Sequence, residues 1–257
     1  MSLKRILFTI VLLALATSGK AQLFSNEIGA FAGPVAFYSD YGERNDNSTN
    51  LGNVGFGIGL VHYMNFSTGG FSGFNSPFFQ DHFKVRNEIT YSKVNLQHYG
   101  QWVDPDRTSL TAQQLRGMRG ESSVLSLGTN LEFHFLSIRS FESGGPRFSP
   151  SIGIGFNYSL FSPRAFSELG VLGDPAVTPE KYQGAFTNEA GSTFSLVGTL
   201  GTRYKISRSE DISLNLRWQT FFSDLVDGLN PDETLYPENK ANDWMVSINV
   251  AYIFYFE

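Results

Sequence analysis

The chain has 257 residues, a net charge of −5, 17% charged residues, 24 Phe, 11 Tyr and 26 Gly. A soluble globular domain carries roughly 25% charged residues, so this composition is untypical of a soluble helical enzyme and favours a sheet with one face against an apolar medium. The sequence contains no Cys, which excludes disulfides, Cys-bound zinc, thiol nucleophiles and a lipidated cysteine.

Residues 1–21 have the pattern of a secretory signal peptide. Lys4 and Arg5 precede a short apolar run, and small residues precede a cleavage position after Ala21. The run is too short for a transmembrane helix, and a buried N-terminal helix is the alternative interpretation. We therefore expect a signal peptide over 1–21 and a single barrel domain over 22–257.

Cleavage would make the chain more acidic. Three of the 19 basic residues lie in the leader, which leaves 16 against 24 acidic residues and a net charge of −8. This charge argues against a nucleic-acid partner. No later segment has 18 consecutive apolar residues, so we expect no transmembrane helix.

Apolar residues alternate with small or polar ones in a series of segments, which is the pattern of β-strands with two different faces. A weak first segment at 27–37 is interrupted by Gly33-Pro34. Clearer segments follow at residues 54–60, 83–91, 123–135, 152–160, 194–205, 212–219 and 244–256. The total is eight, an even number and the smallest that closes a transmembrane barrel.

The connections differ in length at the two ends of these strands. Long polar connections lie at residues 39–53, 99–120, 161–191 and 224–242. The others lie at residues 67–81, 136–148 and 206–211. Long external loops with shorter periplasmic turns are typical of bacterial outer-membrane barrels, so we expect localisation in the outer membrane and contact with its lipids.

A soluble β-sandwich or barrel would show the same alternation with its apolar face turned inward. The interior of an eight-stranded barrel is only just wide enough for side chains to fill it. Small and polar residues suit that interior, whereas the Phe, Leu and Trp face is too bulky for it and must face lipid. The sequence therefore predicts a closed eight-stranded antiparallel transmembrane barrel.

The face predicted to point inward carries charges of both signs. Its ionisable residues are Lys84, Arg86, Glu88, Glu132, His134, Arg203, Lys205 and Arg217, with Glu27 on the weaker first strand. Buried charges persist when they are paired, so we expect an ion-pair network across the lumen. The alternative is a gated or selective pore; at eight strands we favour a plug.

Catalytic and metal motifs are absent from the sequence. His62, His82, His98 and His134 lie far apart, and none belongs to a metalloprotease or nucleophile-elbow motif. The acidic segment around Asp227 lacks the calcium-loop spacing, and the chain has no Walker sequence. We expect no enzyme activity and no catalytic, cofactor or metal site.

The connection at 67–81 is unusual because it displays four phenylalanines among Gly and Ser. These residues are Phe71, Phe74, Phe78 and Phe79. An exposed apolar cluster of this kind is a candidate periplasmic docking patch. Burial under the barrel mouth, or a place in an aromatic girdle at the lipid interface, is the alternative.

Several segments, in the same order along the chain, resemble the PorG-like outer-membrane barrels of Bacteroidota. The first is NEIGAFAG at residues 26–33, which is followed by Asp40-x-Gly42 and by HYMN at residues 62–65. The later ones are RGESSVLSLGTNLEF at 119–133, FSPSIGIGFNYSLFSP at 148–163, ISLNLRWQTFFSDLVDGL at 212–229 and NDWMVSINVAYIF at 242–254. The Gly- and Phe-rich insert at 67–79 departs from the family pattern.

This resemblance implies a structural or assembly component of the type IX secretion and gliding machinery. In that family the barrel tethers periplasmic ring lipoproteins to the outer membrane, and these lipoproteins would then be the partners. Two other hypotheses stay open: a generic small barrel for adhesion or envelope integrity, and a barrel that transports a small or lipidic molecule.

Overall fold

The computed structural model describes residues 25–43, 46–66 and 77–256, which hold eight antiparallel strands. They are β1 (Ser25–Tyr38), β2 (Val54–Asn65), β3 (Phe83–Gln97), β4 (Met118–His134), β5 (Phe148–Ser167), β6 (Gly191–Lys205), β7 (Glu210–Phe221) and β8 (Trp244–Phe256). Each strand pairs with the next, and β1 also pairs with β8, so the sheet closes on itself. The predicted eight-stranded antiparallel barrel is confirmed.

Short helices occupy the connections. They are η2 (Asn47–Thr49), α2 (Pro77–His82), η4 (Gln101–Val103), α3 (Leu110–Gly117), α4 (Ile138–Glu142), η5 (Glu180–Tyr182) and η6 (Pro237–Asn239). Among the described residues, no helix is both long and apolar enough to cross a membrane.

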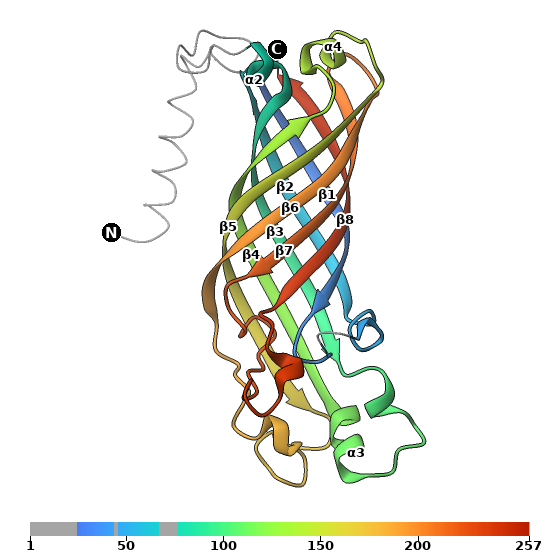
Figure 1. Ribbon diagram of the computed structural model, residues 1–257, viewed down its shortest axis with the longest axis vertical. Helices are drawn as coiled ribbons and strands as arrows, with labels where there is room; N and C mark the ends of the chain where they lie inside the picture. Colours follow the sequence, from blue (N-terminus) through green and yellow to red (C-terminus); the bar gives the residue numbers. More distant parts are fainter. Residues whose placement is uncertain (1–24, 44–45, 67–76, 257) are drawn as a thin grey trace, which may run out of the picture.

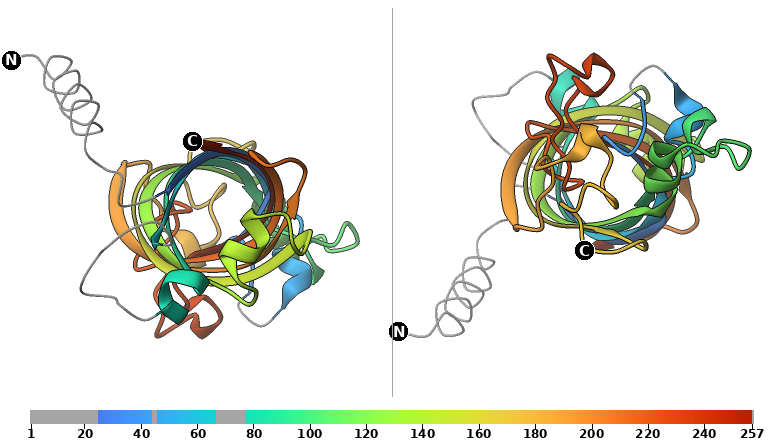
Figure 2. Two further views of the ribbon diagram at one scale, coloured as in Figure 1. Left: turned by 90° about the horizontal axis from the view of Figure 1, so that it is seen from above. Right: turned by 90° about the horizontal axis from the view of Figure 1, so that it is seen from below.

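An even number of antiparallel strands returns the chain to the end of the barrel from which it started. The start of β1 and the end of β8 therefore lie at the same end as α2 and α4, and α3 lies at the opposite end (Figure 1). Figure 2 shows the strands as a closed ring from both ends. We call the end with the start of β1 and the end of β8 the inner end and the end with the long connections the outer end; in outer-membrane barrels these face the periplasm and the exterior.

A band of exposed apolar side chains surrounds the barrel. On β5 its members are Phe148, Ile152, Ile154, Phe156, Tyr158 and Leu160. The twelve steps from Phe148 to Leu160, at about 3.3 Å each and a tilt of about 40°, span about 30 Å along the barrel axis, close to the thickness of the bilayer core. The apolar face thus points outward, as predicted.

Three strands continue past this band at the outer end, and there the polarity of the two faces reverses. The side chains that face outward there include Lys93, Asn95, Glu121, Ser162 and Arg164. Those that face inward are buried and mostly apolar: Val94, Leu96, Met118, Val124, Phe161 and Ala165. We call residues 92–97, 118–124 and 161–167 the outer extension. Water rather than lipid surrounds it, so its apolar residues turn inward.

The strands are longer than predicted for this reason. The predicted strands at 83–91, 123–135 and 152–160 lack the outer extension, because the alternation changes its sense where the surroundings change from lipid to water. The expected break at Gly33-Pro34 is also wrong. These two positions are skipped in the pairing with β8 and kept in the pairing with β2, so β1 stays one strand and only its ladder with β8 is interrupted there.

Gly33 itself is required by a close approach of two strands. A Cβ atom at this position would lie 1.8 Å from the carbonyl oxygen of Ile248 on β8.

The predicted signal peptide lies outside the described residues.

Candidate functional site: the barrel interior and the outer loops

The inner half of the lumen is filled by ion pairs between strands that lie far apart in the sequence. The fully buried carboxylate of Glu27 on β1 pairs with Lys84 on β3 and with Arg203 on β6. Lys84 also reaches Glu142 of α4 at 3.0 Å, and Lys205 pairs with Asp211 at 3.2 Å. The contacts of Glu27 cross the lumen between β1, β3 and β6, whereas Lys205 and Asp211 face each other on the neighbouring strands β6 and β7.

A second layer of charges lies next to the first. The Arg86 side chain pairs with Glu132 at 3.2 Å and with Glu88 at 3.0 Å. On its other side Glu88 accepts a hydrogen bond from Arg217 at 2.7 Å and one from Asn157 at 3.1 Å. Glu88 is thus held by more than one donor, as a buried charge requires.

The predicted lumen residues are therefore brought together in the interior. His134 lies among them, with Nε2 3.7 Å from Glu132 and Nδ1 3.0 Å from the Ser149 hydroxyl. Sequence reasoning missed Glu142 and Asp211. Asp211 shares the parity of Arg217 along β7, which was the available signal, but it was assigned to the preceding turn.

The charges of this interior balance among the described residues. The cations are Lys84, Arg86, Arg203, Lys205 and Arg217. The carboxylates are Glu27, Glu88, Glu132, Glu142 and Asp211. Five of each leave no excess charge of either sign, unlike the rings of like charge that give many channels their ion selectivity.

Two further layers close the lumen toward the outer end. The amide of Gln219 lies within hydrogen-bond distance of the hydroxyls of Ser126, Ser159 and Ser195, at 2.8–3.3 Å. Above it, side chains of the outer extension pack with residues from β1, β7 and β8 and from the loops. The buried members of this apolar layer include Phe37, Phe161, Phe221, Val226 and Leu229. From the inner end to the outer end, the lumen is thus filled first by charged and polar side chains and then by apolar ones.

At the inner end, α2 carries Phe78 and Phe79, two of the four predicted docking residues. Phe78 is 58% exposed and stacks on His82, with ring centroids 4.5 Å apart. Phe79 stacks on Phe83 at 4.6 Å, and that ring lies against Phe133. These two rings therefore join aromatic residues of β3 and β4 at the inner edge of the apolar band. Phe71 and Phe74 lie outside the described residues.

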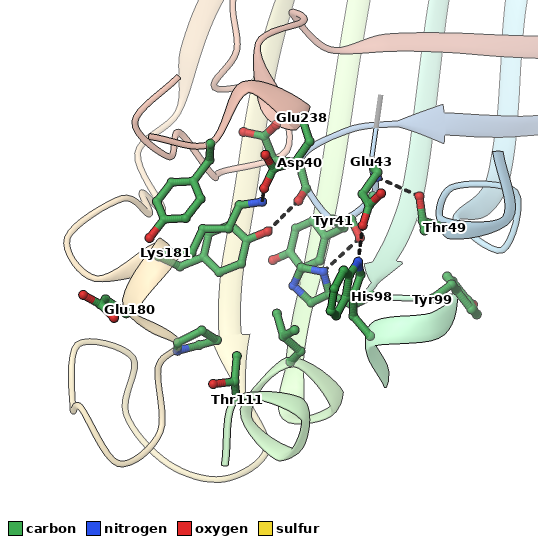
Figure 3. Close-up of a pocket in the computed structure, with 16 residues that line it drawn as sticks. Asp40, Tyr41, Glu43, Thr49, His98, Tyr99, Thr111, Glu180, Lys181 and Glu238 are labelled. Carbon is green, nitrogen blue, oxygen red and sulfur yellow. Dashed lines mark hydrogen bonds and ion pairs between the residues drawn. The ribbon is translucent and has the colours of Figure 1, made fainter. Parts of the chain in front are cut away.

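At the outer end, all four long connections meet around a pocket of about 590 Å³ (Figure 3). Aromatic side chains dominate its wall: Tyr41, His98, Tyr99, Trp102, Tyr182 and Tyr236. Its charged lining residues are Asp40, Glu43, Glu180, Lys181 and Glu238. Sequence reasoning missed this pocket, because its residues come from four separate loops and no spacing connects them.

His98 is neutral in this pocket, and its tautomer is fixed. Its Nδ1 donates a hydrogen bond to the carbonyl oxygen of Tyr41 at 2.9 Å, which requires the proton on that nitrogen. Burial, together with the nearby charges of Lys181 and Arg119, lowers the pKa of His98 to about 3. Its Nε2 is buried and has no hydrogen-bond partner among the described residues.

Beside the pocket lies a group of buried carboxyls, of which Asp40 and Asp227 belong to connections that the sequence predicts to be polar. The backbone N–H of Asp40 donates to Asp227 at 2.8 Å, and the N–H of Asp227 donates to Asp243 at 2.9 Å. Burial raises the pKa of all three carboxyls, and mutual repulsion raises the pKa of Asp40 and Asp243 further. Burial and the charge of Asp227 also raise the pKa of the neighbouring Asp224 to about 8.

Comparison with known proteins finds no matching family model and no similar curated protein. Solved structures that resemble the chain include Neisserial surface protein A, at 11% identity and a TM-score of 0.46 over 90% of this chain and 97% of that one. Others are OprG from Pseudomonas aeruginosa, at 14% identity and 0.45 over 91% and 98%, and a major outer membrane protein from Thermus thermophilus, at 12% and 0.49 over 91% and 99%.

The architecture itself decides the location of the protein. A closed antiparallel barrel has no free sheet edge, and its exposed band is apolar over the thickness of a bilayer core. This is a small β-barrel of the outer membrane. Its filled interior leaves the two ends, the aromatic inner rim and the outer pocket, as the surfaces on which other molecules can act.

Proposed function

We propose that this protein is a non-conducting anchor of the outer membrane that works through its two ends. The observation that carries the proposal is the filled lumen, in which neutralised ion pairs, a hydrogen-bonded Gln219 and an apolar layer follow one another. A path for ions or solutes would have to break all three layers. A transport role for a small or lipidic molecule is correspondingly disfavoured.

Electrical recording from the purified protein in a planar bilayer tests this proposal. We expect no discrete conductance steps, while a porin added to the same membrane gives them. Heat-modifiable migration on a gel shows in parallel that the inserted barrel is folded. Reproducible steps from folded protein would contradict the anchor proposal and favour a transport role.

The resemblance to PorG-like barrels supports a finer proposal, in which the anchored partners are periplasmic ring lipoproteins of the type IX secretion machinery. The aromatic inner rim supplies a surface for such partners, because Phe78 is exposed at the end that faces the periplasm. A generic small barrel for adhesion or envelope integrity is the alternative, and the outer pocket is the feature that favours it.

Gentle-detergent purification of a tagged chain, followed by mass spectrometry, separates these two roles. We expect ring lipoproteins to co-purify and to be lost when Phe78 and Phe79 are both replaced by Ser. The matched control is Phe135→Ser, which removes an exposed ring of the same rim outside α2. Retention of the partners by a heat-modifiable double variant would contradict docking at α2, and their absence from the wild-type sample would contradict the type IX role.

A further inference from the structure

The outer pocket combines a concave shape with polar atoms that its own wall leaves without partners. Its volume of about 590 Å³ lies in the range of small-molecule sites. Two buried atoms in its wall, His98 Nε2 and Asp40 Oδ2, make no hydrogen bond among the described residues. Buried polar atoms in native proteins are normally paired, so the wall does not satisfy all of its own polar groups.

Most hydrogen-bond donors of the pocket wall already donate to other groups of the protein. The indole N–H of Trp102 donates to Glu43, and Lys181 donates to Glu238 at 2.8 Å and to Asn239. Three Tyr hydroxyls donate to main-chain carbonyl oxygens: Tyr41 to that of Arg119, Tyr99 to that of Gly52 and Tyr182 to that of Asp40. The hydroxyls of Thr111 and Tyr236, which can also accept, and the third N–H of Lys181 remain as side-chain donors among the described lining residues.

The acceptors are largely free. The exposed carboxylate of Glu180 has no hydrogen bond or ion pair among the described residues. Glu43 uses one carboxylate oxygen for Trp102. With Glu238, three carboxylates line the pocket against the single cation of Lys181, while the raised pKa of Asp40 keeps its carboxyl protonated. The ligand must therefore bring hydrogen-bond donors and positive charge.

The aromatic rings suit the same class of ligand, because the face of an aromatic ring attracts cations. Two cations of the chain already show this chemistry at the pocket. The ammonium of Lys181 lies 5.2 Å from the ring centre of Tyr236 and 5.5 Å from that of Tyr182. The guanidinium of Arg107 lies 4.7 Å from the ring centre of Trp102.

We propose that the outer pocket binds an organic cation with an ammonium or guanidinium group, in contact with Glu43, Glu180 and the aromatic rings of the wall. The cation can be a free polyamine or a basic side chain of a peptide, since both present the same donors. The proposal is independent of the anchor function, because it concerns the outer end alone.

Isothermal titration calorimetry of the full chain in detergent micelles tests it, with spermidine and an arginine-containing tripeptide as the two probes. We expect saturable binding of at least one probe, which identifies the source of the cation, and weaker binding at higher salt. Glucose and inorganic phosphate are the neutral and anionic controls. Saturable binding of a control ligand, or of neither cation, would overturn the proposal.

Variants locate the site. Glu180→Gln and Glu43→Gln should each weaken binding about fivefold to tenfold, because each removes a charged acceptor that is partly screened by water. Glu189→Gln is the matched control: it removes an exposed carboxylate of the outer loops that does not line the pocket, and it should change binding less than about twofold. Glu180 is exposed, so its substitution leaves folding intact. Equal effects of the Glu180 and Glu189 substitutions would contradict binding in this pocket.

Discussion

At the scale of single residues, an ion pair inside the barrel and an ion pair on its outer surface differ in their exposure to water. Glu27 is fully buried between Lys84 and Arg203, whereas Glu121 and Lys93 form their ion pair with 32% and 50% of their side chains exposed. Removing one member of a buried pair leaves an uncompensated charge, while an exposed pair is screened by water.

We therefore expect Glu27→Gln to lower the free energy of unfolding by about 3–5 kcal/mol, and Glu121→Gln to lower it by less than about 1 kcal/mol. Urea titration of the two variants in liposomes, followed by tryptophan fluorescence, measures both values. Similar losses for the two variants would mean that the lumen pairs contribute no more than surface pairs.

The two faces of one strand give a second contrast. Leu216 on β7 is 45% exposed within the apolar band, and Asn215 beside it is buried and donates to Ser213 at 2.8 Å. At the bilayer midplane Leu216→Arg should cost about 2–4 kcal/mol. Asn215→Ala loses a single hydrogen bond and should cost about 1 kcal/mol. The same urea titrations decide the order, and a reversed order would contradict the assignment of the faces.

At the scale of elements, the outer extension depends on a glycine. The ring of Tyr41 packs against Gly120 on β4, where a Cβ atom would lie 2.6 Å from that ring. Tyr41 is almost fully buried and donates to the carbonyl oxygen of Arg119 at 3.0 Å. A side chain at position 120 must displace this ring, which belongs to the apolar layer that closes the lumen.

Gly120→Ala should consequently loosen the outer loops while the barrel below stays folded. We expect faster cleavage of the outer loops by an added protease, with heat-modifiable migration unchanged. Gly198→Ala on β6 is the control, because no atom lies within 4 Å of a Cβ atom there, and its cleavage rate should equal that of the wild type. Loss of heat-modifiable migration in the Gly120 variant would show that the two parts fold as one unit.

The elements also show what the sequence could predict. Period-two alternation finds the strands of the membrane band, because every residue of one parity there faces lipid. The outer extension escaped prediction because Val94 and Leu96 face inward while Lys93 and Asn95 face water, so the sense of the alternation is reversed. The charged lumen residues of the strands follow from parity, whereas Glu142 lies on α4 and does not. The outer pocket does not, since its residues come together only when the barrel has closed.

At the scale of the whole molecule, the outer end should respond to pH. The carboxyls beside the pocket have pKa values raised above the ordinary 3.8, to about 8 for Asp224, because burial and mutual repulsion disfavour their charged forms. The folded outer end thus binds more protons than the unfolded loops. Its stability is fully present below pH 4 and is lost as the pH rises through these raised pKa values.

We expect protease cleavage of the outer loops to accelerate between pH 5 and pH 9, measured at constant protease activity. Asp224→Asn removes one of the titrating groups and should flatten this dependence. Its carboxylate oxygens have no hydrogen-bond partner among the described residues, so the substitution breaks no contact there. An unchanged dependence in this variant would exclude Asp224 as a contributor.

The outer extension also sets how far the pocket stands from the lipid. The seven residues of β5 beyond Leu160, at about 3.3 Å each and a tilt of about 40°, rise about 18 Å above the edge of the hydrocarbon core. The headgroup layer on one side of a bilayer accounts for about 5–8 Å of that height. The loops that surround the pocket therefore stand clear of the headgroups. A cationic group attached to a polymer or a particle too large to enter the headgroup layer can still reach them.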